Sequence, residues 1–108
     1  MRFKKQNRWR NATEKRKYIT WRRIVFTLNK VKYGYSKHYI CMKCGKRRKT
    51  TRTMHAHHHY SWHHFPDKRY DKQNGVVLCV TCHNTFHQKY QFKAIEDPRC
   101  LNEYLSKS

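Results

Sequence analysis

The stretch 74–87 reads NGVVLCVTCHNTFH and decides how the chain is expected to fold. Its first two residues predict a turn. The apolar run 76–79 is typical of a short buried strand. A helix is expected to begin at Thr81 or Cys82, directly after the strand. A strand that continues into a helix can present side chains of both elements at one place, and here those side chains are thiols and imidazoles.

The helix in this stretch carries two histidines on one face. His83 and His87 are four residues apart, so their Cβ atoms should lie about 6 Å from each other. Cys82 cannot share that face, because neighbouring helical residues are rotated by about 100°. The thiol and the two imidazoles should therefore face different metal ions.

Two cysteine pairs with the same internal gap supply a structural metal site. Cys41 and Cys44 are followed, after 34 residues, by Cys79 and Cys82. Two intervening residues let both thiolates of a pair reach one ion, and Gly45 permits the tight turn. We predict a tetrahedral Zn²⁺ site of four thiolates in preference to buried free thiols. A finger of two Cys and two His is disfavoured, because about 12 residues should separate its last Cys from its first His.

A cluster of histidines precedes this stretch in a segment that suits a strand, residues 53–60. In a strand, alternate side chains point to opposite faces. One face then carries Thr53, His55, His57 and His59, and the other carries Met54, Ala56, His58 and Tyr60. Imidazoles are common metal ligands and exchange protons near neutral pH. The cluster is therefore a candidate for both metal binding and proton transfer.

Net charge indicates the partner. Lys and Arg total 26 against six acidic residues, giving a formal charge of +20. The cations extend from Arg2 to Lys107, so the folded surface itself should be cationic and should bind a polyanion. Nucleic acid fits better than membrane, because no run is long and apolar enough to span a bilayer and residues 1–10 lack the apolar core of a signal peptide. We expect a cytoplasmic, reduced chain.

The organisation expected is one small α+β domain over residues 1–108, stabilised by zinc because a chain of this size has a small core. Its parts are a basic arm (1–10), a helix and connector (11–40), a zinc-stapled core (41–92) and a C-terminal segment (93–108). The basic helix should be capped by Asn11 and should bury Tyr18, Trp21, Val25 and Leu28.

These motifs together resemble the HNH endonuclease family, whose core is a ββα-metal unit. The features that carry this resemblance are a strand with His57 and His58, Asn74 before a second strand, and a helix with His83 and His87. HAHHHYSW (55–62) and RYDKQNGVVLCVTCHNTFH (69–87), with the flanking CxxC, are similar to the small zinc-stapled HNH nucleases of phages and mobile elements. If the chain is phage-encoded, its compartment is the host cytoplasm.

The resemblance implies hydrolysis of DNA phosphodiester bonds to 5′-phosphate and 3′-hydroxyl ends. His58 would be the general base and Asn74 would orient it by an amide or backbone hydrogen bond, which fixes its tautomer. His57, His83 and His87 would hold one divalent ion, Mg²⁺, Mn²⁺ or Zn²⁺. The run of three histidines leaves the register open, so the base could be His58 or His59; Ala56 before the run and residues 60–62 after it favour His58.

A noncatalytic zinc-stapled nucleic-acid-binding module is the alternative function, since the charge and the two CxxC pairs suit it without catalysis. It leaves Asn74 and the histidine cluster unexplained. One HNH core holds one active site, so a monomer should nick one strand. Cutting both strands would require a homodimer or two sequential events, and no dimer seam is evident in the sequence.

Overall fold

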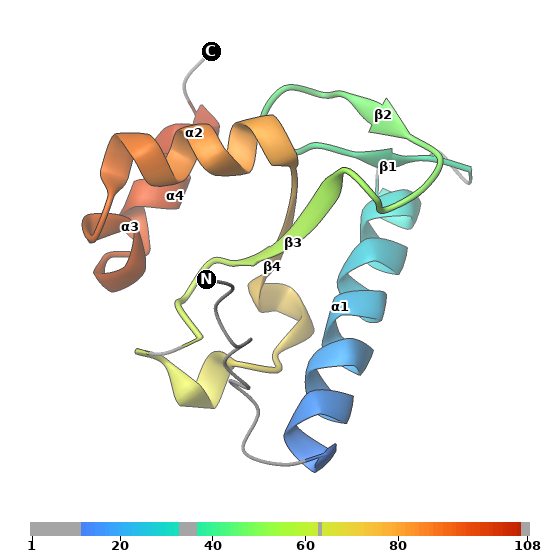
Figure 1. Cartoon of the computed structure of the whole chain (residues 1–108), viewed down its shortest axis with the longest axis horizontal. Coiled ribbons are helices and arrows are strands. Elements are labelled where there is room, and N and C mark those ends of the chain that lie inside the picture. Colours follow the sequence, from blue (N-terminus) through green and yellow to red (C-terminus); the bar gives the residue numbers. More distant parts are fainter. Residues whose placement is uncertain (1–11, 33–36, 63, 107–108) are drawn as a thin grey trace, which may run out of the picture.

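The structure, a computed structural model, describes residues 12–32, 37–62 and 64–106. The predicted basic arm, the Asn11 cap and part of the connector lie outside these residues. A long helix, α1, lies on one side of a β-hairpin, and three shorter helices, α2 to α4, lie on the other side (Figure 1). A second hairpin, whose two strands have two residues each, lies at one end of the fold. This arrangement confirms the predicted small α+β fold.

The helix α1 (Ala12–Lys32) forms from 21 residues that include no glycine or proline. Its buried face holds Trp21, Val25 and Asn29. The Asn29 amide donates to the backbone oxygen of Ile40 at 3.0 Å and accepts from the backbone nitrogen of Ile40 at 2.8 Å. This pair of bonds fixes the start of the segment that carries the first cysteine pair on α1, and it satisfies a polar side chain that would otherwise be costly to bury.

The buried face of α1 differs from the prediction at one position. Leu28 was expected to be buried, but it is 40% exposed, whereas Phe26 is 3% exposed. The buried arc is centred near Val25 and Asn29, and at about 100° per residue Phe26 falls at one end of it while Leu28 falls beyond the other. The helical spacing of apolar residues alone predicted that α1 has a buried face, but it placed the centre of the buried arc part of a turn away from where it lies.

The central hairpin pairs β3 (Met54–His58) with β4 (Gly75–Cys79), antiparallel, with His57 opposite Val76. Both strands fall within a residue or two of the predicted ones. β4 is buried from Val76 to Cys79 because helices cover it on both sides. Gly75 is required by close packing, since a Cβ at this position would lie 2.1 Å from a methyl carbon of Val25.

The knuckle of the first cysteine pair lies between β1 (Tyr39–Ile40) and β2 (Arg47–Arg48). Gly45 has a φ of +79°, the left-handed conformation that favours glycine, and its amide donates to the backbone oxygen of Cys41 at 2.9 Å. The basic run 46–52 supplies the returning strand β2, and the tip of this hairpin is the cysteine knuckle itself.

Three helices complete the chain: α2 (Val80–Tyr90), α3 (Lys93–Glu96) and α4 (Arg99–Ser106). Between β3 and β4 run two short 3₁₀ turns, Pro66–Lys68 and Lys72–Asn74. The helix α2 begins earlier than predicted, because the Cys79 side chain caps it by accepting from the Cys82 amide. Cys100 is buried, as a small hydrophobe would be.

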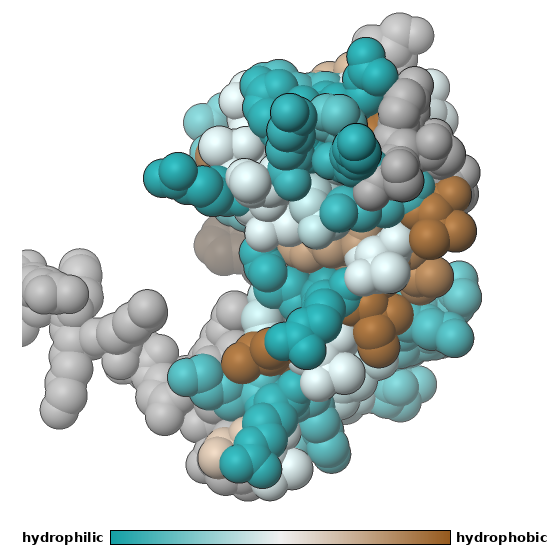
Figure 2. All heavy atoms as spheres, turned by 90° about the vertical axis from the view of Figure 1, so that its right-hand side faces the viewer, coloured by the Kyte–Doolittle hydropathy of each residue, from teal (hydrophilic) through white to brown (hydrophobic). Residues whose placement is uncertain are grey.

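The surface on the α1 side is mostly hydrophilic with separate hydrophobic patches (Figure 2). Exposed cations on this helix are Lys15, Arg16, Lys17 and Arg23, and Ile24 and Val31 are exposed apolar residues. In the described ranges, none of the helices has the length and apolar character needed to cross a membrane.

Candidate functional site

Four cysteines from the two predicted pairs meet beside the start of α2. The Sγ atoms of Cys41, Cys44, Cys79 and Cys82 all lie within 4.8 Å of one another. The Cys44 and Cys79 sulfurs are 3.8 Å apart, which matches the separation of about 3.8 Å for two sulfurs on a tetrahedral zinc with bonds of about 2.3 Å. The donor set and its spacing therefore fit a structural Zn²⁺ ion.

Backbone amides point at these sulfurs and favour thiolates. Burial raises the pKa of Cys41, but hydrogen bonds from backbone groups of Cys44, Cys79 and Lys43 outweigh it and bring the pKa to about 7. Burial and the neighbouring sulfurs raise the pKa of Cys82. The first thiolate forms readily, but its negative charge opposes ionisation of the next thiol. A divalent cation is therefore needed for all four thiols to ionise together.

A groove of about 550 Å³ lies between α1 and α2. All five residues of β3 line it, from both faces of the strand. Among the described strands, β3 pairs only with β4, so the groove follows the second edge of β3. Neighbouring residues that point to opposite faces can therefore both reach this groove, which is how His57 and His58 come to share one site.

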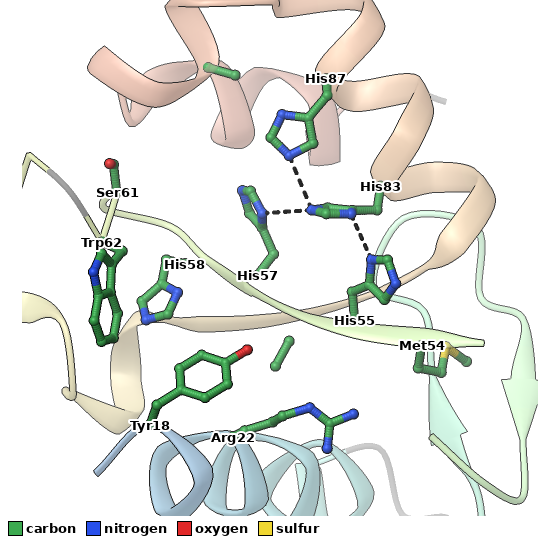
Figure 3. Close-up of a pocket in the computed structure, with 12 residues that line it drawn as sticks. Tyr18, Arg22, Met54, His55, His57, His58, Ser61, Trp62, His83 and His87 are labelled. Atoms are coloured by element: carbon green, nitrogen blue, oxygen red, sulfur yellow. Dashed lines mark hydrogen bonds between the residues drawn. The ribbon is translucent and has the colours of Figure 1, made fainter. Parts of the chain in front are cut away.

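On the α2 side of the groove, three imidazoles converge; we call His57, His83 and His87 the groove triad (Figure 3). Nε2 of His83 lies 3.2 Å from Nδ1 of His57 and 3.1 Å from Nε2 of His87. Nitrogens that share one ion at about 2.1 Å lie about 3.0–3.4 Å apart. The triad thus fits a divalent ion, held separately from the cysteine site as helical rotation predicted.

The groove triad is neutral in the folded chain. Burial, followed by the nearness of His83 and His87, lowers the pKa of His57 to about 3. Burial, followed by His87 and His55, lowers the pKa of His83 to about 4. Burial also lowers the pKa of His87. Neutral imidazole is the form that binds metal, so no proton has to leave these three rings near neutral pH.

His58 points to the α1 side of the groove. Its ring stacks on Trp21, with centroids 3.8 Å apart and planes inclined by 10°, and the edge of Trp62 faces it at 5.7 Å. Nε2 of His58 lies 2.9 Å from the backbone oxygen of Arg69. A carbonyl can only accept, so Nε2 carries the proton, and in a neutral ring Nδ1 is then the nitrogen able to take up another.

Asn74 acts on the backbone around His58 and does not bond its ring. The buried Asn74 side chain accepts from the Tyr60 amide at 2.6 Å and donates to the oxygens of Tyr60 and Lys68 at 2.9 and 3.0 Å. Its own backbone oxygen accepts from the His59 amide. The direct bond to His58 was therefore wrongly expected; Asn74 fixes both chain segments that place His58, one of which carries the Arg69 oxygen.

The other two histidines of the cluster have different surroundings. Nε2 of His59 lies 3.1 Å from the backbone oxygen of Pro98, and His59 does not line the groove. His55 does line it, with Nδ1 2.7 Å from Nδ1 of His83. Strand alternation placed His55 on the same face as His57, but no role was predicted for it.

A comparison with protein families gives one match, to HNH endonuclease, over residues 41–89. This range contains both cysteine pairs, the histidine cluster, Asn74 and the helix α2. Residues 41–89 are therefore similar to an HNH endonuclease domain. A search of curated proteins and a search of solved structures each found no significant match.

An HNH domain indicates a nuclease or nucleic-acid-binding function. Its ββα unit corresponds here to β3, β4 and α2, which carry the groove triad. The helix α1 lies outside the matched range, yet it supplies Trp21, Tyr18 and Arg22 to the surroundings of the groove and of His58. The functional groove is thus built partly by sequence beyond the HNH match.

Proposed function

We propose that this protein is a metal-dependent DNA endonuclease that hydrolyses phosphodiester bonds. The observation that carries the proposal is the convergence of three imidazoles in a groove that also contains His58. A purely structural metal is already accounted for by the four cysteines, so the groove triad has no need to serve stability. An open groove beside it leaves room for substrate.

His57, His83 and His87 would hold the ion. When bound there, a divalent cation supplies positive charge that stabilises the extra negative charge developing on phosphate during hydrolysis. Imidazole ligands suit Zn²⁺ and other transition ions, whereas Mg²⁺ prefers oxygen ligands. Among the three predicted ions, the triad's chemistry therefore favours Zn²⁺ above Mn²⁺ and Mg²⁺.

His58 is the proposed general base. It would accept a proton at Nδ1 from the attacking water, while the Arg69 oxygen holds the proton on Nε2. Trp21 fixes the plane of the ring, and Asn74 fixes the backbone on both sides of it. Asn74 is thus a positioning residue. His59 is the weaker candidate because its Nε2 is directed at Pro98 and its side chain does not line the groove.

Arg22 is the cation from α1 that lines the groove opposite the triad. Its guanidinium is positioned 4.7 Å from the Phe26 ring, which restricts its motion. A guanidinium at this position can neutralise a phosphate oxygen of the bound strand. Together with the +20 charge, it supports DNA as the substrate. We infer products with 5′-phosphate and 3′-hydroxyl ends from the similarity to HNH endonucleases.

The stoichiometry of cutting would follow from the one groove triad found among the described residues. One copy would nick one strand, and a double-strand break would need a second copy or a second event.

The class of function is tested by incubating supercoiled plasmid with chelated protein to which Mn²⁺, Zn²⁺ or Mg²⁺ is restored. We expect the wild type to form open circles only with metal. His83→Ala should bind DNA equally in a gel-shift assay yet nick at least about 100-fold more slowly. His38→Ala, a histidine outside the groove, is the control. Binding without nicking by the wild type in every metal would instead establish a noncatalytic binding module.

A further inference from the structure

His55 is a fourth histidine in contact with the groove triad but outside it. Its ring stands perpendicular to that of His83, at 84°, with centroids 4.6 Å apart. The two Nδ1 atoms lie 2.7 Å from each other, while Nε2 of His83 faces His57 and His87 (Figure 3). The two nitrogens of His83 therefore face two different sets of partners.

The proton positions follow from this arrangement. If Nε2 of His83 binds an ion, that nitrogen carries no proton, and a neutral ring then carries its proton on Nδ1. Nδ1 of His55 lies at hydrogen-bond distance from it and can accept. His55 must then carry its own proton on Nε2. One bond thus specifies the tautomers of both rings.

We propose that His55 is a positioning residue of the metal centre: it accepts a hydrogen bond from Nδ1 of His83 and so directs Nε2 of His83 at the ion. This inference rests on the proposed function of the groove triad. Ligand histidines commonly donate their second N–H to a carboxylate or carbonyl acceptor, which orients the ring and increases its basicity. In this site the acceptor would be the neutral imidazole of His55.

A role for His55 as a fourth ligand of the same ion does not fit the geometry. Nitrogens bound to one ion lie about 3.0–3.4 Å apart, whereas the His55 and His83 nitrogens are at the shorter distance of a hydrogen bond. In addition, the nitrogen of His83 that faces His55 is on the opposite side of the ring from the one that faces the triad. A single imidazole cannot direct both nitrogens at one ion.

The choice of a neutral acceptor has a chemical consequence. The described residues that line the groove include no Asp or Glu. A carboxylate beside His83 would orient the ring but would also repel a phosphate entering the groove. His55 supplies the hydrogen bond without adding negative charge, so the groove keeps the positive character that a polyanionic strand requires.

The first test is metal affinity, measured by Co²⁺ titration of protein loaded with one equivalent of Zn²⁺, which fills the four-thiolate cysteine site and leaves the groove triad for Co²⁺. His55→Leu should weaken Co²⁺ binding about 10- to 100-fold. His55→Asn, which keeps an acceptor near the position of Nδ1, should bind within about threefold of the wild type. His59→Leu is the matched control, because His59 lies on the other side of His57 in the chain at the same sequence distance, and it should leave binding unchanged.

The second readout is the tautomer, observed by ¹⁵N NMR of zinc-saturated protein. We expect a proton on Nδ1 of His83 and none on Nδ1 of His55. Equal Co²⁺ affinity in His55→Leu, or a zinc-bound Nδ1 of His55, would overturn the positioning role while leaving the triad intact. Absence of any histidine-bound Co²⁺ in the wild type would overturn the proposed metal centre and this inference together. Thermal melting checks that each variant is folded.

Discussion

The pH range in which the groove can bind an ion is set by three residues, His57, His83 and His87. Three imidazoles with the ordinary pKa of about 6.5 would weaken metal binding about 70-fold between pH 8 and pH 6, because protons compete for each ring. The pKa values of His57 and His83 are about 3 and 4, and that of His87 is also lowered. A depressed pKa means that competition begins only as the pH falls toward the folded value.

We therefore predict that the Co²⁺ affinity of the triad changes less than about threefold between pH 8 and pH 6 and is lost only at lower pH. The measurement is a Co²⁺ titration at both pH values, followed in the visible spectrum. A fall of tenfold or more over this interval would show that the free triad takes up protons near neutral pH and is more exposed than the structure has it.

At this scale the sequence predicted which side chains would gather, but not how they bond. Ligand spacing identified Cys41, Cys44, Cys79 and Cys82 because CxxC geometry is local. The bond between His58 and Arg69, and that between His55 and His83, join residues brought together by packing. Their geometry depends on ring rotations and loop paths that no spacing rule contains.

The zinc knuckle and the start of α2 are the elements that depend on the cysteine site. Cys41 and Cys79 are buried in the core, and the Cys79 side chain caps α2. Structural zinc in small domains contributes about 10–16 kcal/mol of binding free energy at pH 7, which is comparable to the whole stability of a domain. Removal of zinc should thus affect the packing of β4 and α2, and α2 carries His83 and His87 of the groove triad.

We predict that chelated, reduced protein shows no cooperative thermal transition, and that Cys44→Ser retains less zinc and melts at a lower temperature than the wild type. Cys100→Ala is the control, since Cys100 lies outside the cluster. Circular dichroism and zinc content are the measurements. If zinc-free protein melted at the same midpoint as the zinc-loaded form, the cysteine site would not support the fold.

Helices and strands with a strong hydrophobic or capping pattern in the sequence were predicted well. Elements that form only by packing or pairing with another element were predicted poorly. The strand β3, the strand β4 and the helix α2 follow from alternation, an apolar run and capping. The two-residue strand β2 could not be recognised, because Arg47 and Arg48 have no apolar pattern and become a strand only by pairing with β1. The buried arc of α1 was also misjudged, since its centre is set by the hairpin that packs on it.

The whole molecule combines a small core, which includes the cysteine cluster, with an excess of positive charge. Counterion release makes the affinity of such a protein for DNA fall steeply with salt, so binding alone is weak support for catalysis. Under the proposed function, a nuclease would be distinguished by His58, the proposed proton acceptor, lining the same groove as the groove triad. Catalysis would then depend most on His58.

The most direct test is the rate of plasmid nicking under single-turnover conditions, with protein in excess of DNA and metal saturating. We predict that His58→Ala slows nicking about 100- to 10,000-fold, as expected for loss of a general base. His59→Ala, the adjacent histidine whose ring faces Pro98, should nick within about threefold of the wild type. Nicking by His58→Ala at the wild-type rate, or a loss of nicking in His59→Ala alone, would contradict the account.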